Sequence, residues 1–217
     1  MLNQKTLLIF SPTIEDGGVE KNLFNISNFL STKIDNIFLI TANTNKKRNF
    51  NRKINIIAPN SYYWIHKSRL IKTLICLKLF IKFFLTHKNK IVIFSFNSNL
   101  YAILIGIIFN YKVIIRSNTS PLSYSSNLIK KKIFSFFFKF ADELIVNSLE
   151  FKNQIKNEFN LNAKYIYNPL ENLKEINKKA NQNFKFNFFN RKHTNIVSLG
   201  RLARLVPYTV VPYKIVP

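Results

Sequence analysis

The residues best suited to chemistry are two adjacent glycines near the start of the chain. Gly17 and Gly18 stand between an apolar run at residues 6–10 and an amphipathic segment that begins at Val19. A glycine turn between a buried strand and a helix start leaves backbone N–H groups beside the positive end of the helix dipole. The pattern favours binding of a phosphate or another anion, and the alternative is a tight loop without a ligand.

Metal, disulfide and common nucleotide chemistry have no signature in the sequence. Cys76 is the only cysteine, and His66, His87 and His193 are too far apart to form a metal-ligand motif. The chain contains no P-loop lysine motif and no G-x-G-x-x-G. We therefore predict no metal and no bound cofactor, and the ATPase and dinucleotide-dehydrogenase classes lack support.

The formal net charge of +23 predicts an anionic partner. Nucleic acid, anionic lipid head groups and phosphorylated substrates all meet that description, although a bias towards A/T-rich codons would also enrich lysine. Most of the cations are lysines, whereas specific base and phosphate contacts favour arginine. No nucleic-acid-binding motif is present, so we predict no nucleic-acid partner.

The elements that must position these residues alternate along the chain. Apolar runs predict strands at residues 6–10, 37–41, 54–58, 91–95, 112–115, 143–146 and 163–166. Helical spacing predicts helices at residues 19–30, 64–86, 99–109, 128–140 and 149–159. Continuous apolar strands separated by helices indicate an α/β fold, a doubly wound parallel sheet of the Rossmann-like kind. Any site then lies in the loops at the carboxyl ends of the strands.

The rest of the chain differs in composition. We predict a Rossmann-like domain at residues 1–170, a lysine- and asparagine-rich linker at 171–193, and the first strand of a truncated second domain at 194–217. Three Val-Pro pairs near the end indicate an aberrant tail. We identify no secretory leader, and the best membrane-span candidate, residues 70–85, is too short and carries lysines.

Three separated motifs carry a family resemblance. The first is the turn Gly17-Gly18-Val19-Glu20. The second is the pair of segments at 141–148 and 164–170, which contain Ala-Asp before a strand and Asn-Pro after the next. The third is the strand 195–202, which ends in Gly-Arg-Leu. In this order and spacing the set resembles the family-4 glycosyltransferases of the GT-B fold.

The resemblance implies a retaining, metal-independent transfer of a sugar from a nucleotide-sugar to a glycan or lipid-linked acceptor. Gly17 and Gly18 would approach the donor diphosphate with backbone N–H groups. Gly200 and Arg201 would begin the donor side, where Arg201 would stabilise the charge on the leaving phosphate.

On the acceptor side, the resemblance points to the loops after two strands. Arg116, Ser117 and Asn118 would offer a cation together with hydroxyl and amide groups, and Asn97 would lie nearby. The alternative for this loop is an ordinary capped turn.

The sequence also departs from the family pattern. Many relatives have a histidine after the fourth strand, where this chain has Phe96-Asn97-Ser98-Asn99. Only Arg204 could replace the basic residue that usually follows Gly-Arg-Leu. The remainder of the donor domain is missing, so we expect the chain to be inactive alone.

Lysines interleaved with apolar residues in two predicted helices favour attachment to an anionic membrane surface. The candidates are Lys72, Lys78, Lys82, Lys130, Lys131 and Lys132. We therefore expect a cytoplasmic protein, peripheral on the inner face of the cytoplasmic membrane. The alternative function is a non-catalytic basic module that binds a membrane or a partner protein.

Overall fold

The computed structural model describes residues 6–15, 17–87, 90–122, 127–170 and 173–182. The chain divides into two units, Met1–Glu171 and Asn172–Pro217. The predictions for Gly200, Arg201, Arg204 and the strand at 194–199 lie outside the described residues.

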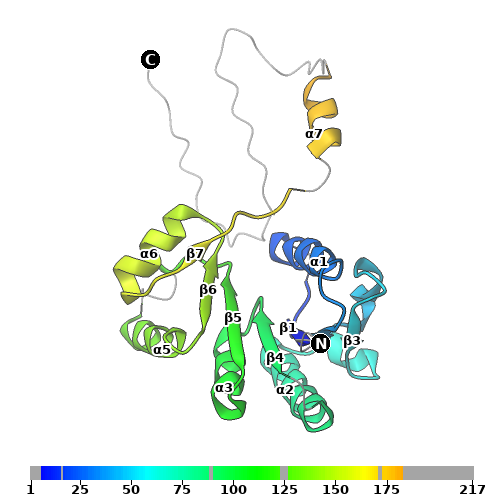
Figure 1. Ribbon diagram of the computed structural model, residues 1–217, viewed down its shortest axis with the longest axis vertical. Coiled ribbons are helices and arrows are strands. Elements are labelled where there is room, and N and C mark those ends of the chain that lie inside the picture. The colour runs from blue at the N-terminus through cyan, green and yellow to red at the C-terminus, as the bar shows by residue number, and fades with distance from the viewer. Residues whose placement is uncertain (1–5, 16, 88–89, 123–126, 171–172, 183–217) are drawn as a thin grey trace, which may run out of the picture. The chain divides into compact units, whose positions relative to one another are not determined.

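The first unit contains a seven-stranded sheet in which every pairing is parallel. Its strands are β1 (Thr6–Phe10), β2 (Ile37–Ile40), β3 (Asn55–Ile57), β4 (Ile91–Ser95), β5 (Lys112–Ser117), β6 (Glu143–Val146) and β7 (Lys164–Tyr165). Their order across the sheet is β3-β2-β1-β4-β5-β6-β7, with β1 in the interior (Figure 1). The predicted doubly wound, Rossmann-like fold is confirmed.

The helices of this unit are α1 (Gly18–Leu30), α2 (Arg69–Thr86), α3 (Asn99–Phe109), α5 (Leu128–Phe138) and α6 (Leu149–Phe159). Two 3₁₀ helices, Thr44–Asn49 and Tyr62–His66, lie in the connections on either side of β3. The predicted helix at 64–86 is therefore divided in two. Ser68 causes the break, because its Oγ accepts a hydrogen bond from the Ile71 N–H and caps the first turn of α2.

The two faces of the sheet carry separate cores, because alternate residues of a strand point to opposite sides. Leu8 and Phe10 of β1 belong to a core that includes buried residues of α2, α3, α5 and α6. Leu7 and Ile9 belong to a second core, which includes Leu23 of α1. One face therefore packs against four helices, and the other packs mainly against α1.

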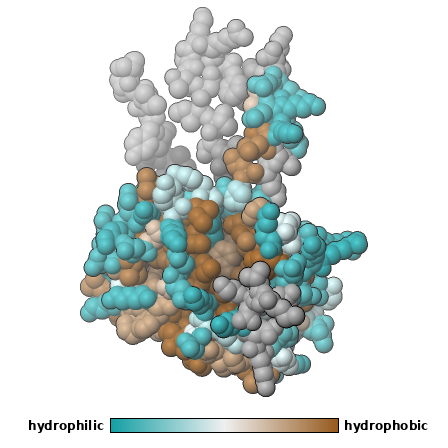
Figure 2. Space-filling model, viewed as in Figure 1, coloured by the Kyte–Doolittle hydropathy of each residue, from teal (hydrophilic) through white to brown (hydrophobic). Residues whose placement is uncertain are grey.

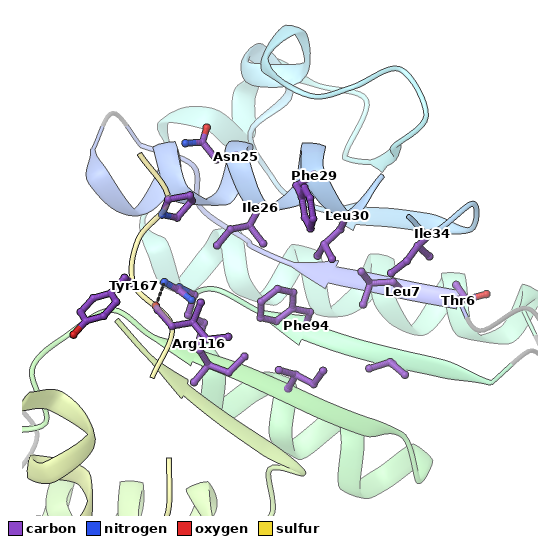
Figure 3. Close-up of a pocket in the computed structure, with 15 residues that line it drawn as sticks. Thr6, Leu7, Asn25, Ile26, Phe29, Leu30, Ile34, Phe94, Arg116 and Tyr167 are labelled. Carbon is purple, nitrogen blue, oxygen red and sulfur yellow. Dashed lines mark hydrogen bonds between the residues drawn. The ribbon is translucent and has the colours of Figure 1, made fainter. Parts of the chain in front are cut away.

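The face that packs against α1 is only partly covered. Val92, Ile114 and Ile145 are partly buried there. They line an apolar cavity of about 730 Å³ together with residues of α1. Figure 3 shows this cavity, with Arg116 and Tyr167 at one end and Thr6 at the other. Figure 2 shows apolar side chains gathered in the middle of the same unit.

The second unit is described only around α7 (Leu173–Ala180). This helix lies inside the segment expected to be a linker, and its residues are all exposed. Glu175 and Lys179 are spaced i,i+4 and form an ion pair at 2.8 Å, which supports a solvated helix. The polar composition of the segment did not indicate this helix.

Gly106 of α3 packs directly against Val113 of β5. A Cβ atom there would overlap the Val113 side chain and lie 3.2 Å from the Tyr111 carbonyl oxygen, whereas a Cβ on Gly18 would meet nothing within 4 Å. We expect Gly106→Ala to lower the free energy of unfolding by about 1–3 kcal/mol through overpacking. Gly18→Ala, the matched control, should leave it unchanged or raise it by up to about 1 kcal/mol. Urea denaturation measures the free energy of unfolding of both variants. An equal change in Gly106→Ala and Gly18→Ala would contradict this packing.

Candidate functional site

A cavity of about 370 Å³ lies beside the carboxyl ends of β1 and β4. These strands are neighbours, but the chain continues from β1 to β2 on one side and from β4 to β5 on the other. The loops after the two strands therefore diverge, which is the arrangement where open α/β sheets bind ligands. The cavity is lined by Thr13, Val19, Glu20, Arg69, Phe96, Asn97, Ser98, Asn99, Leu100, Tyr101, Arg116, Asn118, Thr119 and Phe134. We take it as the candidate site because the larger apolar cavity contains few polar groups.

The predicted glycine turn leads directly into this cavity wall. Gly17 is extended, with φ −166° and ψ 178°, and its carbonyl oxygen accepts the Lys21 N–H at 3.1 Å as α1 begins. Val19 and Glu20 then line the cavity. Gly18 is exposed, does not have a positive φ, and has free space where a Cβ would lie. Neither packing nor backbone conformation within this unit requires a glycine at position 18.

Glu15 and Arg69 connect the loop after β1 to the first residue of α2. Arg69 donates from Nε to Glu15 Oε1 at 2.9 Å and from Nη2 to Glu15 Oε2 at 2.7 Å. This hydrogen bonding, together with the Glu15 charge, raises the pKa of Arg69. The bidentate geometry orients the guanidinium at the edge of the cavity.

Three asparagines hold the loops of the site together. Asn97 donates to Ser11 Oγ at 3.2 Å and to the Thr13 carbonyl at 2.9 Å, which joins the loops after β4 and β1. Asn118 donates to the Phe96 carbonyl at 3.3 Å, and Asn99 donates to the Arg116 carbonyl at 3.2 Å.

Unlike their amide nitrogens, the amide oxygens of these asparagines have no hydrogen-bond partner. The Oδ1 atoms of Asn97, Asn99 and Asn118 are buried and accept no hydrogen bond. Asn99 was missed by the sequence analysis, because nothing in its own position distinguishes it from a helix-capping residue. Ser98 was also missed. It adopts a left-handed conformation, with φ 58° and ψ 35°, and its Oγ lies 3.1 Å from Thr73 Oγ1.

Arg116 lies at the end of β5 and is only 1% exposed. Its Nη2 donates to the Ile166 carbonyl at 3.0 Å and to Asn168 Oδ1 at 2.9 Å, and Figure 3 marks a hydrogen bond of Arg116 with a dashed line. Its Nε has no partner, and burial lowers the pKa of the guanidinium. Arg116 therefore anchors the segment after β7 while lining both cavities.

The other acceptor-side candidates lie in different settings. Asn97 and Asn118 line the cavity with Arg116, whereas Ser117 is buried outside its lining and donates to the Thr119 carbonyl at 3.3 Å. The structure therefore brings three of the four predicted residues to one cavity.

The lysines predicted to face a membrane differ in their exposure. Lys72 is 7% exposed, so it does not lie on an outer surface. Lys131 is half-buried and forms an ion pair with Glu158 at 2.9 Å. Lys78, Lys82, Lys130 and Lys132 are exposed. The helical spacing placed Lys72 outward, but it follows the capping residue Ser68 by one turn, on the side of α2 that also carries buried Thr73 and Cys76.

Within the described residues, no three His, Cys, Asp or Glu side chains gather in a way that could hold a metal ion. No helix in the same part of the chain is both long enough and apolar enough to cross a membrane.

Comparisons with known proteins identify the fold. No protein-family description and no curated protein matches the sequence. The structure is similar to Anabaena Alr3699/HepE in complex with UDP and glucose, with a TM-score of 0.52 and 17% identity over 80% of this chain and 49% of that chain. For HepE in complex with UDP, the TM-score is 0.53 and the identity is 13%, over 76% of this chain and 44% of that chain. For the lipopolysaccharide outer core galactosyltransferase WaaB in its apo form, the TM-score is 0.47 and the identity is 18%, over 76% of this chain and 46% of that chain.

The chain thus spans about half the length of the solved structures it matches. Its fold is a Rossmann-like α/β fold that corresponds to about half of a GT-B glycosyltransferase chain.

The anchoring role of Arg116 predicts a local effect of its removal. We expect Arg116→Met to release the segment after β7 and to lower the free energy of unfolding by about 1.5–3 kcal/mol, the range for hydrogen bonds to charged groups. The Ile166 amide, which donates to the Val146 carbonyl at 2.9 Å, should exchange its hydrogen faster. Asn168→Ala removes only one acceptor and should have a smaller effect. Unchanged exchange at Ile166 in Arg116→Met would contradict the anchoring role.

Proposed function

We propose that this chain forms the acceptor-side domain of a family-4 glycosyltransferase. The enzyme would transfer a sugar from a nucleotide-sugar to a glycan or lipid-linked acceptor, with retention of configuration and without a metal. The observation that carries the proposal is the position of the glycine turn. The residues that follow it, Val19 and Glu20, line a cavity at the point where the strand order reverses.

The glycine turn supports a ligand of a particular kind. Because Gly18 has open space around its missing Cβ, a glycine there is explained by close approach of something outside this unit. A diphosphate is suited to that position, since it would lie against backbone N–H groups at the start of α1. HepE, of similar fold, has been solved with UDP and glucose, which agrees with a nucleotide-sugar as the donor.

The proposal assigns the donor side to residues beyond the described ones. Gly200 and Arg201 would begin a second Rossmann-like domain, with residues 171–193 as the connection between the domains. The chain's match to about half of each solved GT-B structure agrees with such a division. The DNA downstream of this chain, read in all frames, should encode the rest of that domain.

A transfer assay tests the proposed activity. We expect the full-length protein to transfer label from at least one nucleotide-sugar to native membrane acceptors, and the 217-residue chain alone to transfer none. Gly18→Val should reduce transfer by about tenfold or more, a loss of at least ~1.4 kcal/mol in transition-state stabilisation. The melting temperature of Gly18→Val should stay close to that of the wild type. The transfer rate of Gly18→Ala should lie between those of the wild type and Gly18→Val.

Two results of this assay count against the proposal. One is full activity of Gly18→Val, which would remove the glycine turn from the reaction. The other is the absence of transfer from every nucleotide-sugar in a panel that covers the common nucleotides and hexoses.

We also propose that α2, α3 and α5 form the surface that attaches to an anionic membrane. The three helices contain no Asp or Glu, and α3 packs against α5 while Phe84 of α2 contacts Phe109 of α3. Their exposed large apolar residues are Leu70, Ile71, Leu74, Ile81, Leu85, Leu104, Ile107, Ile108, Leu128, Ile129, Ile133 and Phe136. Exposed lysines on α2 and α5 would add about 1 kcal/mol each near an anionic surface. Attached in this way, the protein would lie on the inner face of the cytoplasmic membrane.

Vesicle binding tests this surface. We expect sedimentation with vesicles that contain phosphatidylglycerol, and little with phosphatidylcholine alone or at high salt. Lys130→Glu with Lys132→Glu should weaken binding by about tenfold or more, because each reversal removes an attraction of about 1 kcal/mol and adds a repulsion. The control pair, Lys33→Glu with Lys53→Glu, changes exposed lysines outside these helices. Equal losses in both pairs would show a diffuse charge effect and overturn the assignment.

The alternative is a non-catalytic basic module that uses the same surface. The observation that favours it is the extent of this apolar and basic face, which needs no donor domain. Vesicle binding together with no nucleotide-sugar transfer by the full-length protein would select this alternative.

A further inference from the structure

We propose that the aromatic side chains of the 3₁₀ helix Tyr62–His66 anchor this unit in the interfacial layer of an anionic bilayer. This anchor lies outside α2, α3 and α5, and it would set the orientation of the attached protein. The inference rests on the proposed membrane attachment and adds the place at which side chains enter the bilayer.

The exposure of the aromatic residues is the first argument. Tyr62 is 69% exposed and Tyr63 is 58% exposed, although both carry large rings. Leu70, Ile71 and Leu74 at the start of α2 follow closely in the chain and are exposed as well. Single apolar residues are ordinary on a protein surface, but exposed apolar residues that gather in one place indicate an interaction site.

The types of residue are the second argument. Tyr and Trp favour the boundary between hydrocarbon and water, because each has an apolar ring and a polar tip. Trp64 is half-buried, and its ring meets the Tyr63 ring edge-on with 5.1 Å between centroids. Lys67 Nζ lies 4.0 Å from the centre of the Tyr63 ring. A lysine in this position can rest its stem on apolar surface and extend its ammonium to lipid phosphates.

Charge complementarity is the third argument, and it selects the partner. Residues 36–141 contain fourteen lysines, four arginines and no Asp or Glu. The other 3₁₀ helix, Thr44–Asn49, contacts Tyr62–His66 and carries Lys47 and Arg48. Both are exposed and form no ion pair among the described residues. An anionic lipid surface complements these cations.

Other partners would use only part of this surface. A neutral glycan would contact the rings but would leave the cations without counter-charges. Single-stranded RNA would stack on the rings and pair with the cations, but it has no use for the exposed Leu70 and Leu74 beside them. A bilayer interface accommodates aromatic rings, aliphatic side chains and cations together.

Hydrogen bonds hold the anchor in a fixed place. Ser61 Oγ accepts the Tyr63 N–H at 3.2 Å and caps the 3₁₀ helix. Shortly after it, Arg69 pairs with Glu15 in the loop after β1. Arg69 also lines the cavity at the ends of β1 and β4. Insertion of the anchor would therefore hold the carboxyl ends of these strands close to the bilayer.

Tryptophan fluorescence of the 217-residue chain tests the inference, because Trp64 is the only tryptophan. On vesicles that contain phosphatidylglycerol, we expect the emission to shift to the blue and to be quenched when the acyl chains carry bromine. Vesicles of phosphatidylcholine alone, single-stranded RNA and a neutral oligosaccharide should leave the emission unchanged.

Tyr62→Ser together with Tyr63→Ser should raise the dissociation constant for phosphatidylglycerol vesicles about tenfold, because two interfacial rings are lost. The matched control is Tyr165→Ser with Tyr167→Ser. These tyrosines are 42% and 64% exposed, and Tyr165 also has a lysine, Lys152, over its ring. The control pair should bind vesicles as the wild type does.

Unchanged Trp64 emission while the chain sediments with vesicles would reject the anchor and leave the surface of α2, α3 and α5 in place. No sedimentation at all would reject the attachment itself. Equal weakening in the two tyrosine pairs, or the same emission change with RNA, would also overturn the inference. The test uses no nucleotide-sugar, so its result is separate from that of the transfer assay.

Discussion

Hydrogen bonding of β1 on both of its edges is the constraint on which the site depends. Leu7 pairs with Ile37 of β2 on one side and with Val92 of β4 on the other, all in parallel register. A parallel neighbour must be reached by a crossover, and the two crossovers lead away from this point in opposite directions. The loops after β1 and β4 consequently separate, and the cavity lies between them. If β1 lay at the edge of the sheet, the glycine turn would have no facing loop.

The sequence predicted the sheet well because its strands are continuous apolar runs bounded by polar loops. All seven strands predicted up to residue 166 were found, and the helices differ mainly at their ends. The two clear differences have local causes. Ser68 caps α2 and separates it from a 3₁₀ turn, and α7 forms in a polar segment where an ion pair supports a solvated helix. Neither depends on the hydrophobic periodicity from which the prediction was made.

The site was predicted less completely, because sequence motifs identify loops but not what each side chain contacts. Asn97 and Asn118 line the cavity, and the glycine turn leads directly into its wall at Val19. Arg116 also lines it, but its guanidinium is committed to a segment 50 residues further along the chain, a contact that no local pattern reveals. Ser98 and Asn99 matter through a left-handed backbone turn. Glu20 stood in the quoted motif, yet its unpaired state becomes evident only once Glu15 is seen on Arg69.

Amide chemical shifts of the ¹⁵N-labelled chain, recorded with UDP-glucose and a neutral glycoside together, test most directly whether this cavity is the ligand site. The account predicts the largest changes at Gly18, where α1 begins, and at Ser98 and Asn118, which line the cavity. Changes confined to the apolar cavity beneath α1, at Val92 and Ile114, or no changes around the ends of β1 and β4, would contradict it.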